Sequence, residues 1–118
     1  MQILLFILND APYGSEKAYN ALRMAITLLK EQAEVEVRIF LMADAVTCAL
    51  PEQTTPQGTY NIARMLKAVL IRGGQVKACG SCCEARGLTG LSLLEGIEIS
   101  TMSQLTQWTV EADKVLTF

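Results

Sequence analysis

Three cysteines lie within five residues of one another in this chain, at Cys79, Cys82 and Cys83. Thiol chemistry needs the thiolate, and backbone N–H groups and the positive end of a helix stabilise a thiolate. Ser81 with Glu84 three residues later forms a capping-box pattern, which predicts that a helical turn begins at Ser81. This places Cys79 just before the turn and the other two cysteines in its first positions, so we expect the protein's chemistry at this cluster.

Two charged side chains near the cluster act in opposite directions. Arg86 adds a positive charge that favours a thiolate or a bound anion, whereas Glu84 disfavours both. The sequence leaves open which of the two dominates. We include Arg86 among the candidate pocket residues.

The cluster also matches two other kinds of thiol site. The Cys79-x-x-Cys82 spacing is that of a zinc knuckle, but a structural zinc takes four ligands, and the chain has no histidine and only Cys48 outside the cluster. The same spacing suits a redox-active dithiol, although Gly87 interrupts the helix that such a motif normally opens. We therefore predict no metal and no cofactor, and keep the dithiol as an alternative.

The other two thiols are predicted to be structural. Cys48 lies in the apolar run of residues 45–50, where a cysteine is typically a small buried hydrophobe. Cys83 is expected to pack beneath the predicted turn.

Residues 10–15 follow the first predicted strand, which is where a phosphate-binding loop would lie. They contain too few glycines for a nucleotide-binding fingerprint, so the sequence gives only a weak indication of nucleotide binding.

The elements that must position these residues are strands alternating with helices. The helix after the first strand is expected to begin near Ser15 and to reach residue 31, a short helical piece covers residues 45–50, and residues 51–58 form an exposed loop. A second helix ends before Gly73 and Gly74, and Thr101 with Gln104 forms a capping box before the last helix. The predicted strands cover residues 3–8, 35–42, 75–78, 96–99 and 114–118.

This alternation predicts one domain over residues 1–118, an α/β fold of the flavodoxin-like three-layer type. Its five-stranded, mostly parallel sheet is expected to have the strand order 2-1-3-4-5. In that order the loops after the first three strands open into one crevice. We therefore expect Asn9, Tyr13 and Asp44 to converge on Cys79 as pocket residues.

The amino-acid composition restricts the kinds of partner that the protein is expected to bind. Hydrophobic residues make up 51% of the 118 residues and charged residues only 19%, which predicts a homo-oligomer that covers part of its apolar surface. A net charge of −2 without a basic run argues against direct nucleic-acid binding. The apolar N-terminal run lacks a basic leader and no run approaches membrane-spanning length, so we expect a cytoplasmic protein with reduced thiols and no membrane contact.

The cysteine cluster and its surroundings resemble the DsrE/DsrF-like family, which includes the sulfur-relay proteins related to TusD and a group of small uncharacterised homologues. The resemblance extends over almost the whole chain and is specific to the small uncharacterised branch. The segments that carry it are residues 9–16, 40–46, 60–62, 76–87 and 112–118.

The resemblance implies a flavodoxin-like sheet and symmetric trimers or hexamers. In sulfur-relay members the sulfur-carrying cysteine ends the third strand, seven residues before the arginine of an Arg-Gly pair, and Cys79 with Arg86 and Gly87 has that spacing. The implied activity is that Cys79 accepts a persulfide sulfur from a donor protein and passes it to an acceptor thiol. This chain departs from the relay pattern by adding Cys82, a possible resolving thiol, and Cys83.

Our leading hypothesis is a sulfur carrier or sulfurtransferase-like protein with Cys79 as carrier. The first alternative is a non-catalytic oligomeric module that binds a small ligand or a protein in the same crevice. The second is a dithiol redox protein that uses Cys79 and Cys82.

Overall fold

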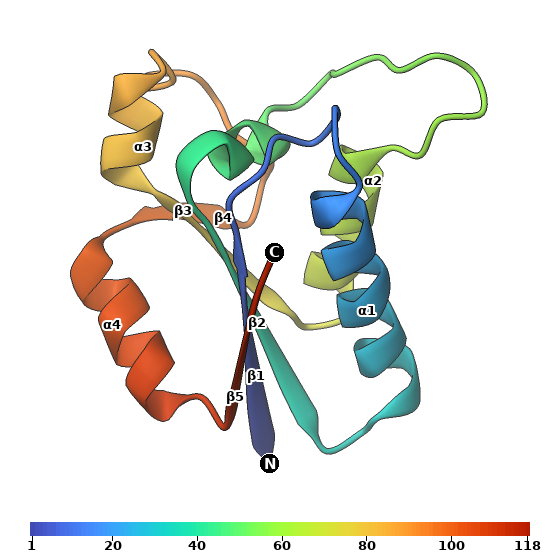
Figure 1. The fold of residues 1–118 in the computed structure, drawn as a ribbon, viewed down its shortest axis with the longest axis vertical. Coiled ribbons are helices and arrows are strands. Elements are labelled where there is room, and N and C mark those ends of the chain that lie inside the picture. The colour runs from blue at the N-terminus through green and yellow to red at the C-terminus, as the bar shows by residue number, and fades with distance from the viewer.

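Strands and helices alternate along the whole chain in the computed structural model, which describes residues 1–118 (Figure 1). The strands are β1 (Gln2–Leu8), β2 (Val35–Leu41), β3 (Gln75–Cys79), β4 (Ile97–Ser100) and β5 (Lys114–Thr117). The α-helices are α1 (Lys17–Glu31), α2 (Ile62–Ile71), α3 (Gly80–Ala85) and α4 (Met102–Glu111), and a 3-10 helix, η1 (Ala43–Ala49), follows β2. The predicted strands and helices are thus all present, with shifts of one or two residues at most ends.

Local signals account for several helix ends. The Ser15 hydroxyl accepts a hydrogen bond from the Lys17 N–H at 3.4 Å, at the beginning of α1. Beyond α2, Gly73 adopts a φ of 93°, a left-handed conformation that favours glycine, and the Gly74 N–H donates to the Val69 carbonyl at 2.9 Å. These contacts confirm that α2 ends at the glycine pair.

The sheet is parallel throughout, but its strand order is β4-β3-β2-β1-β5. The predicted order 2-1-3-4-5 is therefore wrong. The chain moves in one direction from β1 through β2 and β3 to β4, and then returns across the sheet to place β5 on the free edge of β1. There the Phe118 ring stacks on the Phe6 ring at a centroid distance of 5.9 Å. An alternating pattern predicts parallel strands and crossovers, but it does not determine which strands become neighbours.

Helices cover both faces of the sheet. In Figure 1, α1 and α2 lie on one side of the strands and α4 lies on the other. The Phe40 side chain of β2 packs edge-on against Trp108 of α4, with a centroid distance of 6.1 Å. This three-layer arrangement agrees with the predicted fold class. The longest helix has 15 residues, and none combines the length and apolar character needed to cross a membrane.

The predicted capping box of α4 forms only in part. Thr101 Oγ1 accepts from the Gln104 N–H at 3.2 Å, as expected. The Gln104 side chain, however, accepts a hydrogen bond from Lys77 Nζ at 2.7 Å and so ties α4 to β3.

The observed strand order moves the place where a crevice is expected. The connection after β3 continues to β4, whereas the connection after β4 turns back toward β5. The strand order therefore reverses between β1 and β5, and open α/β sheets bind ligands at the carboxyl ends of the strands beside such a reversal. Cys79, at the carboxyl end of β3, lies at the same edge of the sheet but away from this point.

Candidate functional site

Cys79 ends β3 and is the N-cap residue of α3. Its Sγ accepts a hydrogen bond from the Cys82 N–H at 3.4 Å. Ser81, which the capping-box pattern predicted as the cap, lies inside the first turn, so that prediction is wrong. Because the sulfur itself accepts the capping hydrogen bond, the N-cap lies two residues earlier than predicted, and Ser81 Oγ lies 3.3 Å from Cys79 Sγ.

These contacts favour the thiolate form of Cys79. Burial is the largest influence and by itself raises the pKa, but hydrogen bonds from the Ser81 and Cys82 side chains and from their backbone N–H groups outweigh it. The pKa of Cys79 therefore lies below that of an ordinary cysteine. The stabilising groups all belong to the first turn of α3.

Cys82 has the opposite tendency. Burial raises its pKa, the hydrogen bond to Cys79 raises it further, and a hydrogen bond from the Ala43 N–H to its Sγ, 3.2 Å long, only partly compensates. Ala43 begins η1 with a left-handed φ of 49° at the turn after β2. The two sulfurs thus form an asymmetric pair, with a lowered pKa at Cys79 and a raised pKa at Cys82.

Arg86 and Asp44 lie beside Cys82. The Arg86 guanidinium pairs with the Asp44 carboxylate, with Nε and one terminal nitrogen both 2.9 Å from Oδ1, and it also donates to the Cys82 carbonyl at 3.1 Å. Arg86 lowers the pKa of Cys82 slightly, whereas the pKa of Cys79 is lowered by hydrogen bonds. Neither Arg86 nor Glu84 therefore decides the ionisation of Cys79.

Asn9 and Tyr13 take part in other contacts. The Asn9 backbone N–H donates to the Phe118 carbonyl at 2.9 Å, and the Tyr13 hydroxyl accepts from the Ile62 N–H at 3.1 Å. No hydrogen bond joins either residue to the cysteine cluster. Strand β2 lies between β1 and β3, so the loop after β1 is separated from Cys79 by one strand. The expected convergence of all these residues in one crevice is not observed.

A groove of about 380 Å³ opens beside Cys79, between α3 and the beginning of α4. Strand pairing sets Cys79 directly opposite Ser100, the last residue of β4. We call this hollow the Cys79 groove; its lining includes Cys79, Ser81, Glu84, Ser100, Thr101 and Met102. No local sequence pattern links Ser100 to this site, because only the β3–β4 pairing brings it to Cys79.

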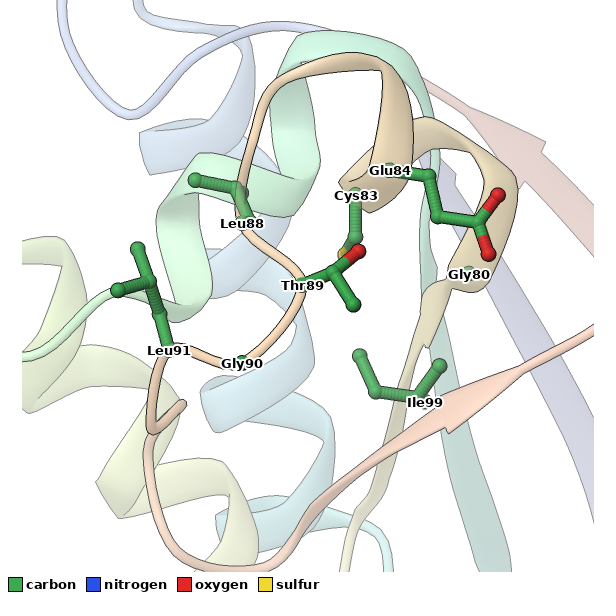
Figure 2. A pocket seen from close by; sticks show the side chains of 8 residues that line it. All are labelled: Gly80, Cys83, Glu84, Leu88, Thr89, Gly90, Leu91 and Ile99. Carbon is green, nitrogen blue, oxygen red and sulfur yellow. The ribbon is translucent and has the colours of Figure 1, made fainter.

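Cys83 opens into a different and smaller pocket of about 150 Å³. In Figure 2, Leu88, Thr89 and Leu91 line this pocket from the loop after α3, and Ile99 lines it from β4. Cys83 is buried, and burial raises its pKa. This burial agrees with the predicted packing role of Cys83.

Cys48 is fully buried in η1, and its thiol donates to the Asp10 carbonyl at 3.8 Å. Burial raises the pKa of this thiol to about 12. No set of three or more histidine, cysteine, aspartate or glutamate side chains is arranged to hold a metal ion. The prediction that Cys48 is a structural residue is confirmed by its burial.

The chain has relatives among known proteins over its whole length. Residues 2–118 match the DsrE/DsrF-like family. Protein YchN of Escherichia coli is 46% identical over the full length of both chains, and its crystal structure superimposes with a TM-score of 0.95. The uncharacterized protein MK0008 of Methanopyrus kandleri is 40% identical over 100% of this chain and 95% of its own.

A more distant solved structure shares the fold alone. Protein MTH1491 of Methanobacterium thermoautotrophicum, a protein of unknown function, is 14% identical, with a TM-score of 0.77 over 99% of this chain and 98% of its own. The family model matches residues 2–118, and the YchN relative is 46% identical over the full length of both chains. We conclude that the chain belongs to the DsrE/DsrF-like family.

Proposed function

We propose that this protein is a sulfur carrier, with sulfurtransferase-like activity, that accepts and passes on a persulfide sulfur at Cys79. The observation that carries the proposal is the Cys79 sulfur itself, which has a lowered pKa and lines a groove at a strand end. A carrier cysteine must be a nucleophile at neutral pH and must be reachable by another sulfur compound. The other three thiols have raised pKa values.

The proposed loading step is a thiolate exchange. The Cys79 thiolate attacks the outer sulfur of a donor persulfide, R–S–SH, and forms Cys79–S–SH. The donor S–S bond breaks, and the donor leaves as the thiolate R–S⁻. In the second step an acceptor thiolate attacks the same outer sulfur and releases the Cys79 thiolate. Both steps balance without an external oxidant or reductant.

The partners in this proposal are a sulfur-donor protein, an acceptor protein and further copies of the chain. Trimers or hexamers would cover exposed apolar side chains such as Ile71 and Val110, which are 85% and 78% exposed. A cytoplasmic location, without contact to membranes or nucleic acid, suits thiols that must stay reduced.

A dithiol redox role is the second candidate, because the Cys82 N–H donates to the Cys79 sulfur at 3.4 Å and so holds the two residues side by side. In that role a disulfide joins the two residues, and two electrons pass to an oxidised partner. Cys82 is also the natural resolving thiol for a persulfide on Cys79. Persulfide and disulfide products differ in mass, so one experiment separates the two roles.

The test is to incubate the reduced protein with a cysteine desulfurase and cysteine, and to map added sulfur by mass spectrometry. We expect one extra sulfur on Cys79, no extra sulfur on the Cys79→Ala variant, and normal loading of the matched control Cys83→Ala. Thermal unfolding of both variants checks that they fold. An unlabelled Cys79, in the presence of a loaded desulfurase, would contradict the carrier proposal.

The Cys79→Ala variant also tests the non-catalytic alternative. A module that only binds a ligand or a protein in this groove needs no sulfur at position 79. Retained biological activity in Cys79→Ala would therefore replace the carrier with a binding module.

A further inference from the structure

Ser100 is the single polar residue among the buried residues of this protein, with 8% of its surface exposed. Its hydroxyl makes no hydrogen bond to another protein group, although buried polar groups nearly always have a partner. No polar side-chain atom is sealed in the interior without a partner. The unpaired Ser100 hydroxyl therefore faces the Cys79 groove, which Ser100 lines.

The strand pairing places this hydroxyl beside the reactive sulfur. Cys79 and Ser100 are directly opposite each other in the parallel β3–β4 ladder. Side chains alternate along a strand, so paired residues point to the same face, and neighbouring strands lie about 4.8 Å apart. A Cβ atom on Gly80 would lie 3.1 Å from the Ser100 carbonyl oxygen, so the chain after Cys79 passes close to β4.

A hydroxyl in this position suits a sulfur atom that gains negative charge as the Cys79 thiolate attacks it. Hydrogen bonds to charged acceptors are stronger than those between neutral groups. The Ser100 hydroxyl has no acceptor in the protein and is free to donate a hydrogen bond. The Cys79 sulfur already has hydrogen-bond partners in α3, namely Ser81 Oγ and the Cys82 N–H. The side of Cys79 that faces β4 is thus the place for a second, ligand-borne sulfur.

The groove suits a small molecule. Its volume of about 380 Å³ lies within the usual range for small-molecule sites. Cys79 is only 5% exposed, so a compact ligand reaches its sulfur through the groove, whereas a folded protein would need to insert a protruding segment.

Resting on the carrier function proposed above, we propose that the Cys79 groove binds a low-molecular-weight persulfide and that Ser100 is a catalytic residue. Its hydroxyl donates a hydrogen bond to the outer sulfur of the bound persulfide. The Cys79 thiolate attacks that sulfur, the S–S bond of the small molecule breaks, and the small thiol leaves as its thiolate. The hydrogen bond persists to the terminal sulfur of Cys79–S–SH, and Ser100 keeps its proton throughout.

The experiment measures the rate at which cysteine persulfide loads sulfur onto Cys79, by intact-mass spectrometry. We expect Ser100→Ala to lower the second-order rate constant about tenfold, because it removes a hydrogen bond to the sulfur under attack, which carries part of the negative charge in the transition state. Ser100→Thr keeps the hydroxyl and is expected to retain most of the rate. The matched control Ser103→Ala removes an exposed serine hydroxyl from α4, outside the groove lining, and is expected to load normally.

Two further measurements separate a catalytic from a structural role. Ser100→Ala removes no internal hydrogen bond, so we expect its unfolding temperature to stay unchanged. Its alkylation rate at Cys79 with iodoacetamide is also expected to stay unchanged, because Ser100 is not among the groups that lower the pKa of Cys79. If the sulfur-loading rate and the alkylation rate of Ser100→Ala fell equally, Ser100 would have a structural role, and the proposal would be overturned.

A second arm uses a protein donor, a persulfidated cysteine desulfurase freed of cysteine by desalting. If Cys79 is loaded by the desulfurase but not by cysteine persulfide, the groove proposal is wrong and the carrier function stands. The same holds if both donors load Ser100→Ala as fast as the original protein. Failure of both donors would contradict the carrier function itself.

Discussion

At the scale of single residues, the reactivity of Cys79 depends on its immediate turn. The donors that stabilise its thiolate are Ser81 and Cys82, which follow it by two and three residues. Arg86, the nearby cation, is paired with Asp44 instead. Changes in this turn should therefore affect Cys79 more than changes in the surrounding charge.

Replacing Ser81 tests this dependence. The Ser81 hydroxyl lowers the pKa of Cys79, so Ser81→Ala should raise that pKa and leave less thiolate at neutral pH. We expect alkylation of Cys79 by iodoacetamide at pH 7 to slow about threefold to tenfold, and to reach the original rate at alkaline pH, where the thiol is fully ionised.

The measurement is the pH profile of the alkylation rate, with Cys79 identified by peptide mapping. Ser103→Ala is the matched control and should keep the original midpoint. An unchanged midpoint in Ser81→Ala would show that Ser81 does not stabilise the thiolate.

At the scale of elements, the junction of β3 and α3 is held close to β4. A Cβ atom on Gly80 would lie 3.1 Å from the Ser100 carbonyl oxygen and 3.2 Å from Ile99 Cγ2. The first of these neighbours is backbone in a hydrogen-bonded strand, which cannot move aside without disturbing the β3–β4 pairing. The absence of a side chain at Gly80 thus keeps Cys79 and Ser100 together.

Gly80→Ala should consequently destabilise the protein by about 1–2 kcal/mol, because an added methyl group overpacks this contact. Urea unfolding followed by circular dichroism measures the loss. Glu84→Ala, on the exposed surface of the same helix, removes no side-chain hydrogen bond; it is the control and should change stability by less than about 0.5 kcal/mol. An unfolding midpoint equal to that of the original protein would mean that the β3–α3 junction tolerates the added methyl group.

At the scale of the whole molecule, the surface carries large apolar side chains that the fold leaves uncovered. Besides Ile71 and Val110, the exposed set includes Leu91, Ile99 and Met102. Met102 lines the Cys79 groove, and Ile99 and Leu91 line the neighbouring Cys83 pocket. Scattered exposed apolar residues are normal, but together with 51% hydrophobic composition they favour self-association.

The family resemblance implies trimers or hexamers, so we expect sedimentation equilibrium to give a mass of three or six times 12.9 kDa, the mass of one chain. The physical reason is the burial of these apolar side chains between copies. If either side chain lies in the interface, the double variant Ile71→Glu with Val110→Glu should have a higher dissociation constant for the oligomer. Lys67→Glu is the surface-charge control. A single species of 12.9 kDa at all concentrations would contradict the proposed oligomer.

The amino-acid sequence by itself determined the elements and the position of the cysteine cluster at a strand end. The apolar run of β1, the helix-ending glycines Gly73 and Gly74 and the Thr101 cap depend on neighbouring residues, so their local patterns predicted them correctly. The spacing from Cys79 to Arg86 and Gly87 was likewise visible in the linear chain, and it led to the family.

Only the tertiary structure decided which of these elements meet. The placement of β5 beside β1, the separation of Asn9 and Tyr13 from Cys79, and the pairing of Cys79 with Ser100 all follow from the strand order. Strand order depends on contacts between segments far apart in the chain, such as Phe6 with Phe118, and local periodicity carries no record of such contacts. The thiol cluster could thus be identified from sequence, whereas the hydroxyl opposite Cys79 could not.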